Sequence, residues 1–323
     1  MVSKNSEQGI MYYYCSYFDH RYLPRGLALY RSLKQHCPEF KWWVLCLSKT
    51  CYDVLSELDL PDIHLIALEE FERGDEALIA AKQNRTLVEY YFTCTPSLPL
   101  FIFRNYPEVD LITYLDSDLF FYSSVEPIYE ELGEQSVGII EHRFSPERLE
   151  LKVFGIYNVG WESFRRDANG LSCLQWWRER CIEWCYDRPE GDRFADQKYL
   201  DDWPTRFPGV VVLQHKGANV AHWNTNNYQI YGDGNRVWID EKPLIFFHFH
   251  GFNHYKQEFE LSGLNPDFKV KRFSDRVIFR DIYAPYLQTL REIAKEVSPL
   301  LPEVSIQSTI RGIAIPAISA NNS

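Results

Sequence analysis

The chain has 323 residues, of which 46% are hydrophobic and 24% charged, an ordinary composition for a globular protein with a sizeable core. Its net charge of −11 disfavours nucleic acid as a partner, because phosphate backbones bind to positive surfaces. The sequence contains neither a long uncharged apolar stretch nor an apolar leader near its start, so it predicts no membrane span and no signal peptide.

Strand-like and helix-like segments alternate along the first third of the chain. Apolar runs predict strands at residues 10–18, 42–48, 64–68 and 109–115. Helical spacing predicts helices at 22–37, 50–58 and 76–92. This alternation predicts a doubly wound α/β fold, with a mostly parallel central sheet and right-handed crossovers. Ligands of such sheets bind at the carboxyl ends of the strands.

The second half of the chain is less regular. It predicts strands at 136–142, 155–161, 209–214 and 243–252, and helices at 170–187 and 282–297. The tail 301–323 has no clear period and predicts a loosely ordered segment. Because no linker or repeat interrupts the chain, we expect a single domain over residues 1–300.

The eight cysteines are scattered without the spacing of a zinc site. Cys181 and Cys185 lie on the apolar face of an expected helix, which favours buried thiols over a metal site. Without a secretion signal, we expect reduced cysteines and a cytoplasmic location, compatible with peripheral contact at the inner face of the membrane.

The strongest local signal is Asp116-Ser117-Asp118, which directly follows the predicted strand at 109–115. Two carboxylates one residue apart repel each other unless water or a cation lies between them. Both can bind one hard divalent cation, such as Mg²⁺ or Mn²⁺, which in turn neutralises a diphosphate. The alternative is an ordinary polar turn, since Asp and Ser favour turns.

The apolar run at 243–252 carries a second signal, because His248 and His250 fall on the same face of an extended strand. One imidazole added to two carboxylates suits Mn²⁺ better than an all-oxygen ligand set does. A hydrogen-bonded core histidine is the alternative for each of the two.

These segments resemble, in order, the motifs of GT-A-fold glycosyltransferases, in particular the retaining group around family eight. YLDSDLFFY resembles the D-x-D element, YNVG the N-x-G strand, FADQKYLD the D-Q-x-x-L segment and HFHG the H-x-x-G element. YFDHRYLPRGLALYRSL is similar to the nucleotide-binding start of that group. The resemblance extends over residues 10–256 and places glycine three residues after His248, which selects His248 over His250 as a ligand.

The resemblance implies that a sugar moves from a nucleotide-diphosphate donor, with a UDP-sugar favoured, to a hydroxyl group of a glycan, lipid-linked glycan or polysaccharide. It implies retention of configuration and a nucleotide-binding half at 1–125 followed by a sugar and acceptor half at 126–300. It also implies an Mn²⁺ or Mg²⁺ ion bound by Asp116, Asp118 and His248.

Further roles follow from the resemblance. The residues expected to contact the donor are Ser16, Tyr17, Asp19, Lys82, Arg85, Asp116, Ser117, Asp118, Gly251 and Lys256. The expected catalytic residues are Asp196, Gln197 and Asn158, beneath an anomeric carbon that gains positive charge. The polar stretch 215–228 is assigned to a sugar through Asn219, His222, Trp223 and Asn224, with a plain surface loop as the alternative. A capped polar turn is likewise the alternative for Asp196 and Gln197.

Two departures from the family pattern concern the phosphates. FNHYK replaces the Lys-Pro-Trp run that usually follows H-x-x-G, and residues 93–103 contain no Arg or Lys, so Lys82 and Arg85 are the expected substitutes. The alternatives are a sugar-nucleotide nucleotidyltransferase and a catalytically silent carbohydrate-binding or scaffold protein. A phosphatase of the haloacid dehalogenase type is disfavoured by Phe120.

Overall fold

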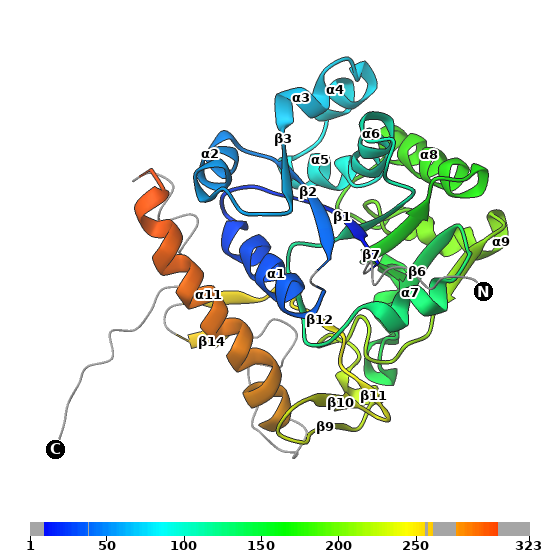
Figure 1. The fold of residues 1–323 in the computed structure, drawn as a ribbon. Coiled ribbons are helices and arrows are strands. Elements are labelled where there is room, and N and C mark those ends of the chain that lie inside the picture. The colour runs from blue at the N-terminus through cyan, green and yellow to red at the C-terminus, as the bar shows by residue number, and fades with distance from the viewer. Residues whose placement is uncertain (1–9, 38, 256–257, 261–275, 303–323) are drawn as a thin grey trace, which may run out of the picture.

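The computed structural model describes residues 10–37, 39–255, 258–260 and 276–302, and its centre is a seven-stranded sheet (Figure 1). The strand order is β3-β2-β1-β4-β7-β6-β8. These strands are β1 Tyr12–Phe18, β2 Phe40–Cys46, β3 Ile63–Ala67, β4 Leu111–Leu115, β6 Val137–Glu141, β7 Tyr157–Arg165 and β8 Val210–Leu213. Strands β1 to β4 are mutually parallel, and β8 is parallel to β6. Only β7 runs antiparallel to both of its neighbours in this sheet, so the predicted mostly parallel α/β sheet is confirmed.

Helices cover both faces of this sheet and enclose one apolar cluster on each side (Figure 1). Neighbouring strand residues supply the two clusters alternately: Trp42 belongs to one and Trp43 to the other. The first cluster includes residues of α1 Leu23–His36, α2 Lys49–Leu58, α7 Glu126–Leu132 and α11 Ala284–Val297. The second includes residues of α3 Leu68–Glu72, α4 Glu76–Lys82, α5 Leu87–Cys94, α6 Ser97–Asn105, α8 Ala168–Glu183 and α9 Trp203–Arg206.

The single helix predicted at 76–92 is wrong, because the chain breaks between α4 and α5. Thr86 begins α5 with a capping box: its hydroxyl accepts from the Glu89 amide at 3.3 Å, and the Glu89 carboxylate accepts from the Thr86 amide at 2.7 Å. A continuous helix over 76–92 would place Val88 on the same apolar face as Ala81, yet Val88 is 46% exposed. Thr86 and Glu89 form a T-x-x-E pattern, the sequence signature of a new helix start, inside the segment predicted as one helix.

The strand predicted at 243–252 is much shorter, because only β12 Phe246–His248 and the two-residue β11 Lys242–Pro243 are extended there. Strand β12 lies outside the central sheet and pairs with β5 Leu119–Phe121. The chain then turns at Gly251, whose φ of +62° favours glycine. Small antiparallel sheets are formed by β9 Ile230–Gly232, β10 Val237–Ile239 and β11, and by β13 Asn253–Tyr255 and β14 Glu258–Glu260.

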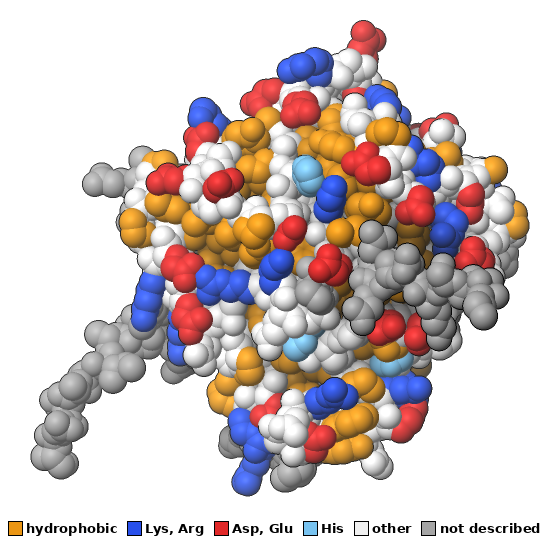
Figure 2. All heavy atoms as spheres, viewed as in Figure 1, with side chains coloured by type: hydrophobic (Ala, Val, Ile, Leu, Met, Phe, Trp, Pro, Cys, Tyr) orange, Lys and Arg blue, Asp and Glu red, His pale blue; other side chains and the backbone are white. Residues whose placement is uncertain are grey.

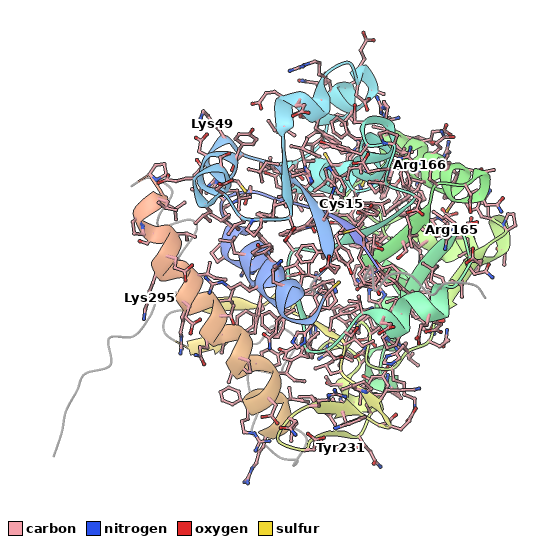
Figure 3. All side chains as sticks on the ribbon, in the orientation of Figure 1. Cys15, Lys49, Arg165, Arg166, Tyr231 and Lys295 are labelled. Carbon is pink, nitrogen blue, oxygen red and sulfur yellow. The ribbon has the colours of Figure 1, made fainter. Side chains whose placement is uncertain are left out.

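Side chains fill the space between the sheet and its helices (Figure 3), and all eight cysteines are buried and free of disulfides, as expected. On the face drawn in Figure 2, acidic and basic side chains are interspersed rather than separated. Among the residues that the structure describes, no helix has the length and apolar character needed to cross a membrane. The predicted tail lies outside the described residues beyond Pro302.

Candidate cation and sugar site

Two chain segments far apart in sequence bring Asp118 and His248 together. Asp116 follows the last residue of β4, the short turn continues through Asp118, and β5 begins at Leu119. His248 ends β12 and lies opposite Leu119 in the antiparallel β5–β12 pair. Strand pairing therefore places the imidazole beside the carboxylates at the carboxyl edge of the central sheet, where α/β folds bind their ligands.

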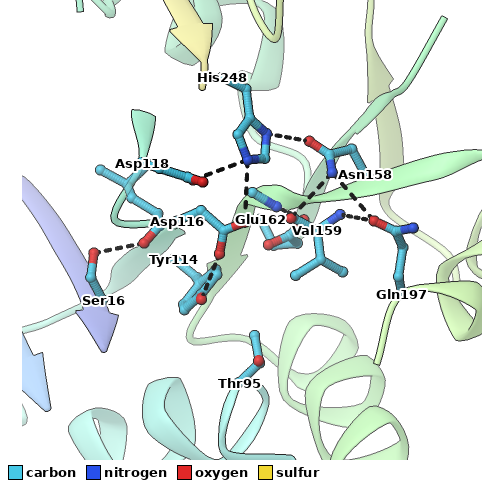
Figure 4. Close-up of polar contacts among 12 residues, drawn as sticks. Ser16, Thr95, Tyr114, Asp116, Asp118, Asn158, Val159, Glu162, Gln197 and His248 are labelled. Atoms are coloured by element: carbon cyan, nitrogen blue, oxygen red, sulfur yellow. Dashed lines mark hydrogen bonds and ion pairs between the residues drawn. The ribbon is translucent and has the colours of Figure 1, made fainter. Parts of the chain in front are cut away.

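The His248 imidazole faces both carboxylates (Figure 4). Its Nε2 atom lies 3.1 Å from Asp118 Oδ1 and 3.6 Å from Asp116 Oδ2. The three side chains are 1%, 11% and 27% exposed for His248, Asp118 and Asp116 respectively. The hydroxyl of Tyr114 donates to Asp116 Oδ1 at 2.8 Å and orients that carboxylate.

Asn158 fixes the tautomer of His248. The Asn158 amide nitrogen donates to Val159 O and to Gln197 Oε1, both at 3.3 Å, so its Oδ1 faces His248 Nδ1 at 2.9 Å. Nδ1 therefore carries the donated proton, which leaves Nε2 as the ring nitrogen that faces the carboxylates and can bind a cation in place of a proton. Histidine ligands of metals are commonly held by such a hydrogen bond at the other ring nitrogen. Asn158, predicted as catalytic, thus positions His248.

Gly160 provides the room for this imidazole. A Cβ atom at residue 160 would lie 3.0 Å from His248 Cε1 and 3.0 Å from Asn158 Oδ1. The Gly160 amide donates to the buried Glu162 carboxyl at 3.1 Å, and its carbonyl accepts from the Asp116 amide at 3.1 Å. Gly160 therefore connects His248 to the turn that carries Asp116. The two defined residues of the N-x-G motif thus both act on His248: Asn158 through a hydrogen bond, and Gly160 by leaving room for the imidazole.

These residues fit a divalent cation. Among the described residues, the buried Nε2 atom of His248 makes no hydrogen bond, and it points toward two carboxylates. His250 is a candidate further ligand, because one ligand atom each of Asp118, His248 and His250 lie within 4.8 Å of one another. A nitrogen and carboxylate set of this kind suits Mn²⁺ and other borderline cations. Sequence alternation had already placed His250 on this face.

The electrostatics favour a positive charge at the same place. Burial by itself lowers the pKa of His248, yet Asp118 and Asp116 raise it above its ordinary value. Burial raises the pKa of Asp116, and the neighbouring Asp118 carboxylate adds to that effect. Asp118 behaves differently: burial opposes its ionisation, but His248 and then His250 and Arg25 lower its pKa. Like charges held this close are stabilised when a cation joins them.

A cavity of about 570 Å³ opens beside these carboxylates. Its polar lining includes Asp116, Asn158 and Asp196, and much of the remaining wall is aromatic. His142 and His222 also line it, and burial lowers the pKa of each to about 3, so both imidazoles are neutral. Trp223 packs against His248 with ring centroids 5.3 Å apart. The cavity thus offers stacking surfaces and neutral hydrogen-bonding groups, the combination that sugars require.

Several predicted site residues line this cavity, and several do not. Those at the cavity are Tyr17, Asp116, Asn158, Asp196, Gln197, His222 and Trp223. His250, which was weighed against His248 as a ligand, also lines it, whereas Thr95, Tyr114, His142 and Gly160 around the cavity were not predicted site residues. Of the residues not predicted, Tyr114 and Gly160 belong to the motifs YLDSDLFFY and YNVG, whereas Thr95 and His142 carried no recognisable signal. Asp19 lies beyond the end of β1, where it accepts from the Arg21 backbone amide and side chain.

The structure does not bring Lys82 and Arg85 to the cavity. Lys82 forms an ion pair with Glu72 at 2.6 Å, and the Arg85 guanidinium stacks over the Tyr186 ring at 4.1 Å. Lys82 is the last residue of α4 and Arg85 follows it, at the point where the predicted single helix is broken.

Other predicted contacts have internal roles. The Ser16 hydroxyl donates to Leu115 O at 2.7 Å and ties β1 to β4. Asn224 donates to His142 O and Asn219 O and so organises its own loop. The Gln197 amide is used within the protein, because it accepts from Val159 N at 3.1 Å and donates to Phe154 O at 3.0 Å. Lys256 lies outside the described residues.

Asp196 is a further carboxylate at the cavity, which Asp187 also lines. It is 3% exposed and accepts from the Thr95 hydroxyl at 2.7 Å, while Tyr17 contacts the same hydroxyl at 3.0 Å. Burial raises the pKa of Asp196 to about 7, and Asp116 contributes to the increase. The folded protein therefore binds this proton more tightly than the unfolded chain does.

This raised pKa predicts a pH-dependent stability difference for Asp196→Asn, whose amide cannot ionise. The Asp196 contribution to wild-type stability declines as pH rises from about 4 to about 7, because only the unfolded carboxyl ionises freely there. Across this window we expect the variant to gain stability relative to wild type by on the order of 3 kcal/mol. Urea denaturation in EDTA at several pH values measures the difference, with the exposed Asp53→Asn as a control. A difference that does not change with pH would contradict the prediction.

Comparison with known proteins identifies the fold. No protein-family model matches the chain. An active-site mutant of LgtC covers 94% of this chain and 100% of its own, with a TM-score of 0.53 and 15% identity. The glycosyltransferase GlyE of Streptococcus pneumoniae covers 90% of this chain and 64% of its own, with a TM-score of 0.48 and 16% identity. The LgtC likeness and the sheet order together define the GT-A fold of glycosyltransferases.

Two proteins of Bacillus subtilis (strain 168) are similar in sequence. The uncharacterized protein YfnD is 32% identical over 281 residues, covering 86% of this chain and 88% of its own length. The uncharacterized protein YfnF is 32% identical over 298 residues, covering 90% and 95%. The chain belongs to the family of YfnD and YfnF.

Proposed function

We propose that the protein is a glycosyltransferase that moves a sugar from a nucleotide-diphosphate donor to a hydroxyl group, with the help of Mn²⁺ or Mg²⁺. The observation that carries this proposal is that His248 Nε2 faces Asp116 and Asp118 beside a cavity of about 570 Å³. The GT-A fold supports it, because open α/β sheets bind their ligands at the carboxyl ends of the strands, where these residues lie.

Asp116, Asp118 and His248 would hold the cation, with His250 as a candidate fourth ligand. When bound, a divalent cation supplies positive charge that stabilises the departing diphosphate. Asn158 keeps Nδ1 of His248 protonated, and Tyr114 orients Asp116. These two residues therefore preorganise the ligand set.

Asp196 is the proposed carboxylate beneath the sugar. Thr95 donates to Asp196 Oδ2 and directs the carboxylate within the cavity lining. In its ionised form, Asp196 would stabilise positive charge that develops at the anomeric carbon. Trp223 and the neutral imidazoles of His142 and His222 would pack against the sugar and hydrogen-bond its hydroxyl groups.

The finer features of the proposal come from the resemblance in sequence. They are a UDP-sugar as the favoured donor, transfer with retention, and a glycan, lipid-linked glycan or polysaccharide as the acceptor. Structures of the galactosyltransferase LgtC include a complex with donor and acceptor sugar analogues, which supports a two-substrate cavity here. We also propose the division at residue 125 into nucleotide and sugar halves, and a cytoplasmic location with peripheral membrane contact.

The proposal is tested by donor turnover with and without a divalent cation. Purified protein is stripped with EDTA and incubated with a panel of UDP-, GDP-, CDP- and dTDP-sugars, while the released nucleoside diphosphate is measured. We expect turnover for one nucleotide class, a loss of at least roughly tenfold after stripping, and recovery with Mn²⁺. Absence of both turnover and cation-dependent binding across the panel would favour a silent carbohydrate-binding protein.

A further inference from the structure

Arg25 is a buried cation whose role the proposed mechanism has not used. It lies in the first turn of α1, directly after Pro24, and is 9% exposed. Its Nη2 donates to the carbonyl of Phe252 at 2.8 Å, and its guanidinium lies 4.6 Å from the centre of the Tyr22 ring. A guanidinium in so dry a position is costly unless a negative charge compensates it.

Backbone hydrogen bonds connect Arg25 to the carboxylate turn. The Phe252 carbonyl that accepts from Arg25 belongs to a turn in which Phe252 N donates to Phe249 O at 3.0 Å. Phe249 N in turn donates to Asp118 O at 3.0 Å. Phe249 lies between His248 and His250, so Arg25 is held against the segment that carries both imidazoles.

The charge of Arg25 has no close carboxylate partner within the described ranges. No Asp or Glu oxygen there lies within 4.0 Å of its guanidinium, whereas Arg21 and Arg31 on either side form ion pairs with Asp19 and with Glu292 and Glu296. Arg25 acts on Asp118 at longer range, as the electrostatics of that carboxyl show. It is therefore placed to interact with whatever charge occupies the carboxylate site.

We propose that Arg25 is the fixed positive charge of this site, disfavouring a bare cation and favouring a cation with a bound diphosphate. This inference rests on the proposed function. It accounts for the phosphate-binding charge that Lys82 and Arg85 do not supply at the cavity. Repulsion from Arg25 weakens binding of the cation alone, and attraction strengthens binding of the diphosphate anion. Arg25 is thus a positioning residue acting through its charge.

The test is Arg25→Met, which removes the charge and retains an unbranched side chain. Mn²⁺ binding is measured by titration calorimetry, and inorganic pyrophosphate binding is measured at a constant free Mn²⁺ concentration. We expect Mn²⁺ to bind about threefold or more tightly in the variant, and pyrophosphate to bind roughly tenfold more weakly. A purely structural role would weaken both, so weaker Mn²⁺ binding or unchanged pyrophosphate binding would overturn the proposal.

Two further variants guard against a folding defect. Arg25→Lys keeps the positive charge and loses the planar guanidinium group. We therefore expect the affinities for Mn²⁺ and for pyrophosphate to stay within about threefold of wild type. A large loss of both in this variant would show that shape rather than charge matters, and would overturn the proposal even if Arg25→Met failed to fold. Arg31→Met removes an exposed charge from the same helix and serves as the matched control.

The wild-type measurements separate this inference from the proposed function. If wild-type protein binds neither Mn²⁺ nor pyrophosphate, the proposed function fails and the Arg25 inference fails with it. If wild-type protein binds both, and Arg25→Met does not change the Mn²⁺ and pyrophosphate affinities in opposite directions, only the Arg25 inference fails.

Discussion

Asp118→Ala is expected to abolish the dependence of donor turnover on a divalent cation. Asp118 Oδ1 lies 3.1 Å from His248 Nε2, and no other carboxylate among the described residues approaches that nitrogen as closely. Loss of this ligand should weaken Mn²⁺ binding by more than about 100-fold, beyond the effect of losing a residue that only supports a ligand. Donor turnover should fall by on the order of 10³-fold, because charge on the leaving diphosphate is no longer neutralised.

Calorimetric titration with Mn²⁺ and the donor turnover assay measure these two effects. Asp118→Asn preserves the shape of the side chain and removes its charge, so it should resemble Asp118→Ala in Mn²⁺ affinity. Glu57→Ala, on the exposed surface of α2, removes one negative charge away from the site and should leave both quantities unchanged. Unaltered Mn²⁺ affinity in Asp118→Ala, in a protein that still unfolds cooperatively in EDTA, would refute the cation site.

Gly160→Ala is the second large expected effect, although it removes no chemical group. The added methyl group would lie 3.0 Å from both His248 Cε1 and Asn158 Oδ1, closer than such contacts normally are. The imidazole must shift, and the hydrogen bond that fixes its tautomer must lengthen. We expect Mn²⁺ affinity to fall roughly 10- to 100-fold. Overpacking should also lower the free energy of unfolding by about 1–3 kcal/mol.

Gly138→Ala is the matched control for Gly160→Ala. A Cβ atom at Gly138 would lie 3.0 Å from Leu132 Cδ1 and 3.2 Å from Leu213 Cδ1, in strand β6 of the same sheet. This variant should lose a comparable amount of stability and bind Mn²⁺ as wild type does. Equal losses of Mn²⁺ affinity in the two variants would mean that Gly160 acts through general stability rather than through His248.

The local sequence pattern was sufficient to predict most strands of the central sheet. The strands ending at Phe18, Cys46 and Leu115 were each expected within a few residues, because buried parallel strands are short apolar runs bounded by polar turns. The pattern predicted one helix at residues 76–92, but the Thr86 capping box begins a second helix there despite the apparently continuous helical spacing. It also extended β12 too far, since the apolar residues after His248 pack in a turn rather than in a ladder.

The sequence by itself determined the fold class, the carboxylate pair after β4 and the two histidines on one face at 248 and 250, because these depend on residue type and on short-range order. Only the tertiary structure decided which side chains share the site. It placed the Asn158 amide oxygen against His248, left Lys82 and Arg85 in contacts away from the cavity, and tied Arg25 to the carbonyl of Phe252. The physical reason is that strand pairing and turn hydrogen bonds between distant segments set these distances, and no local sequence pattern encodes them.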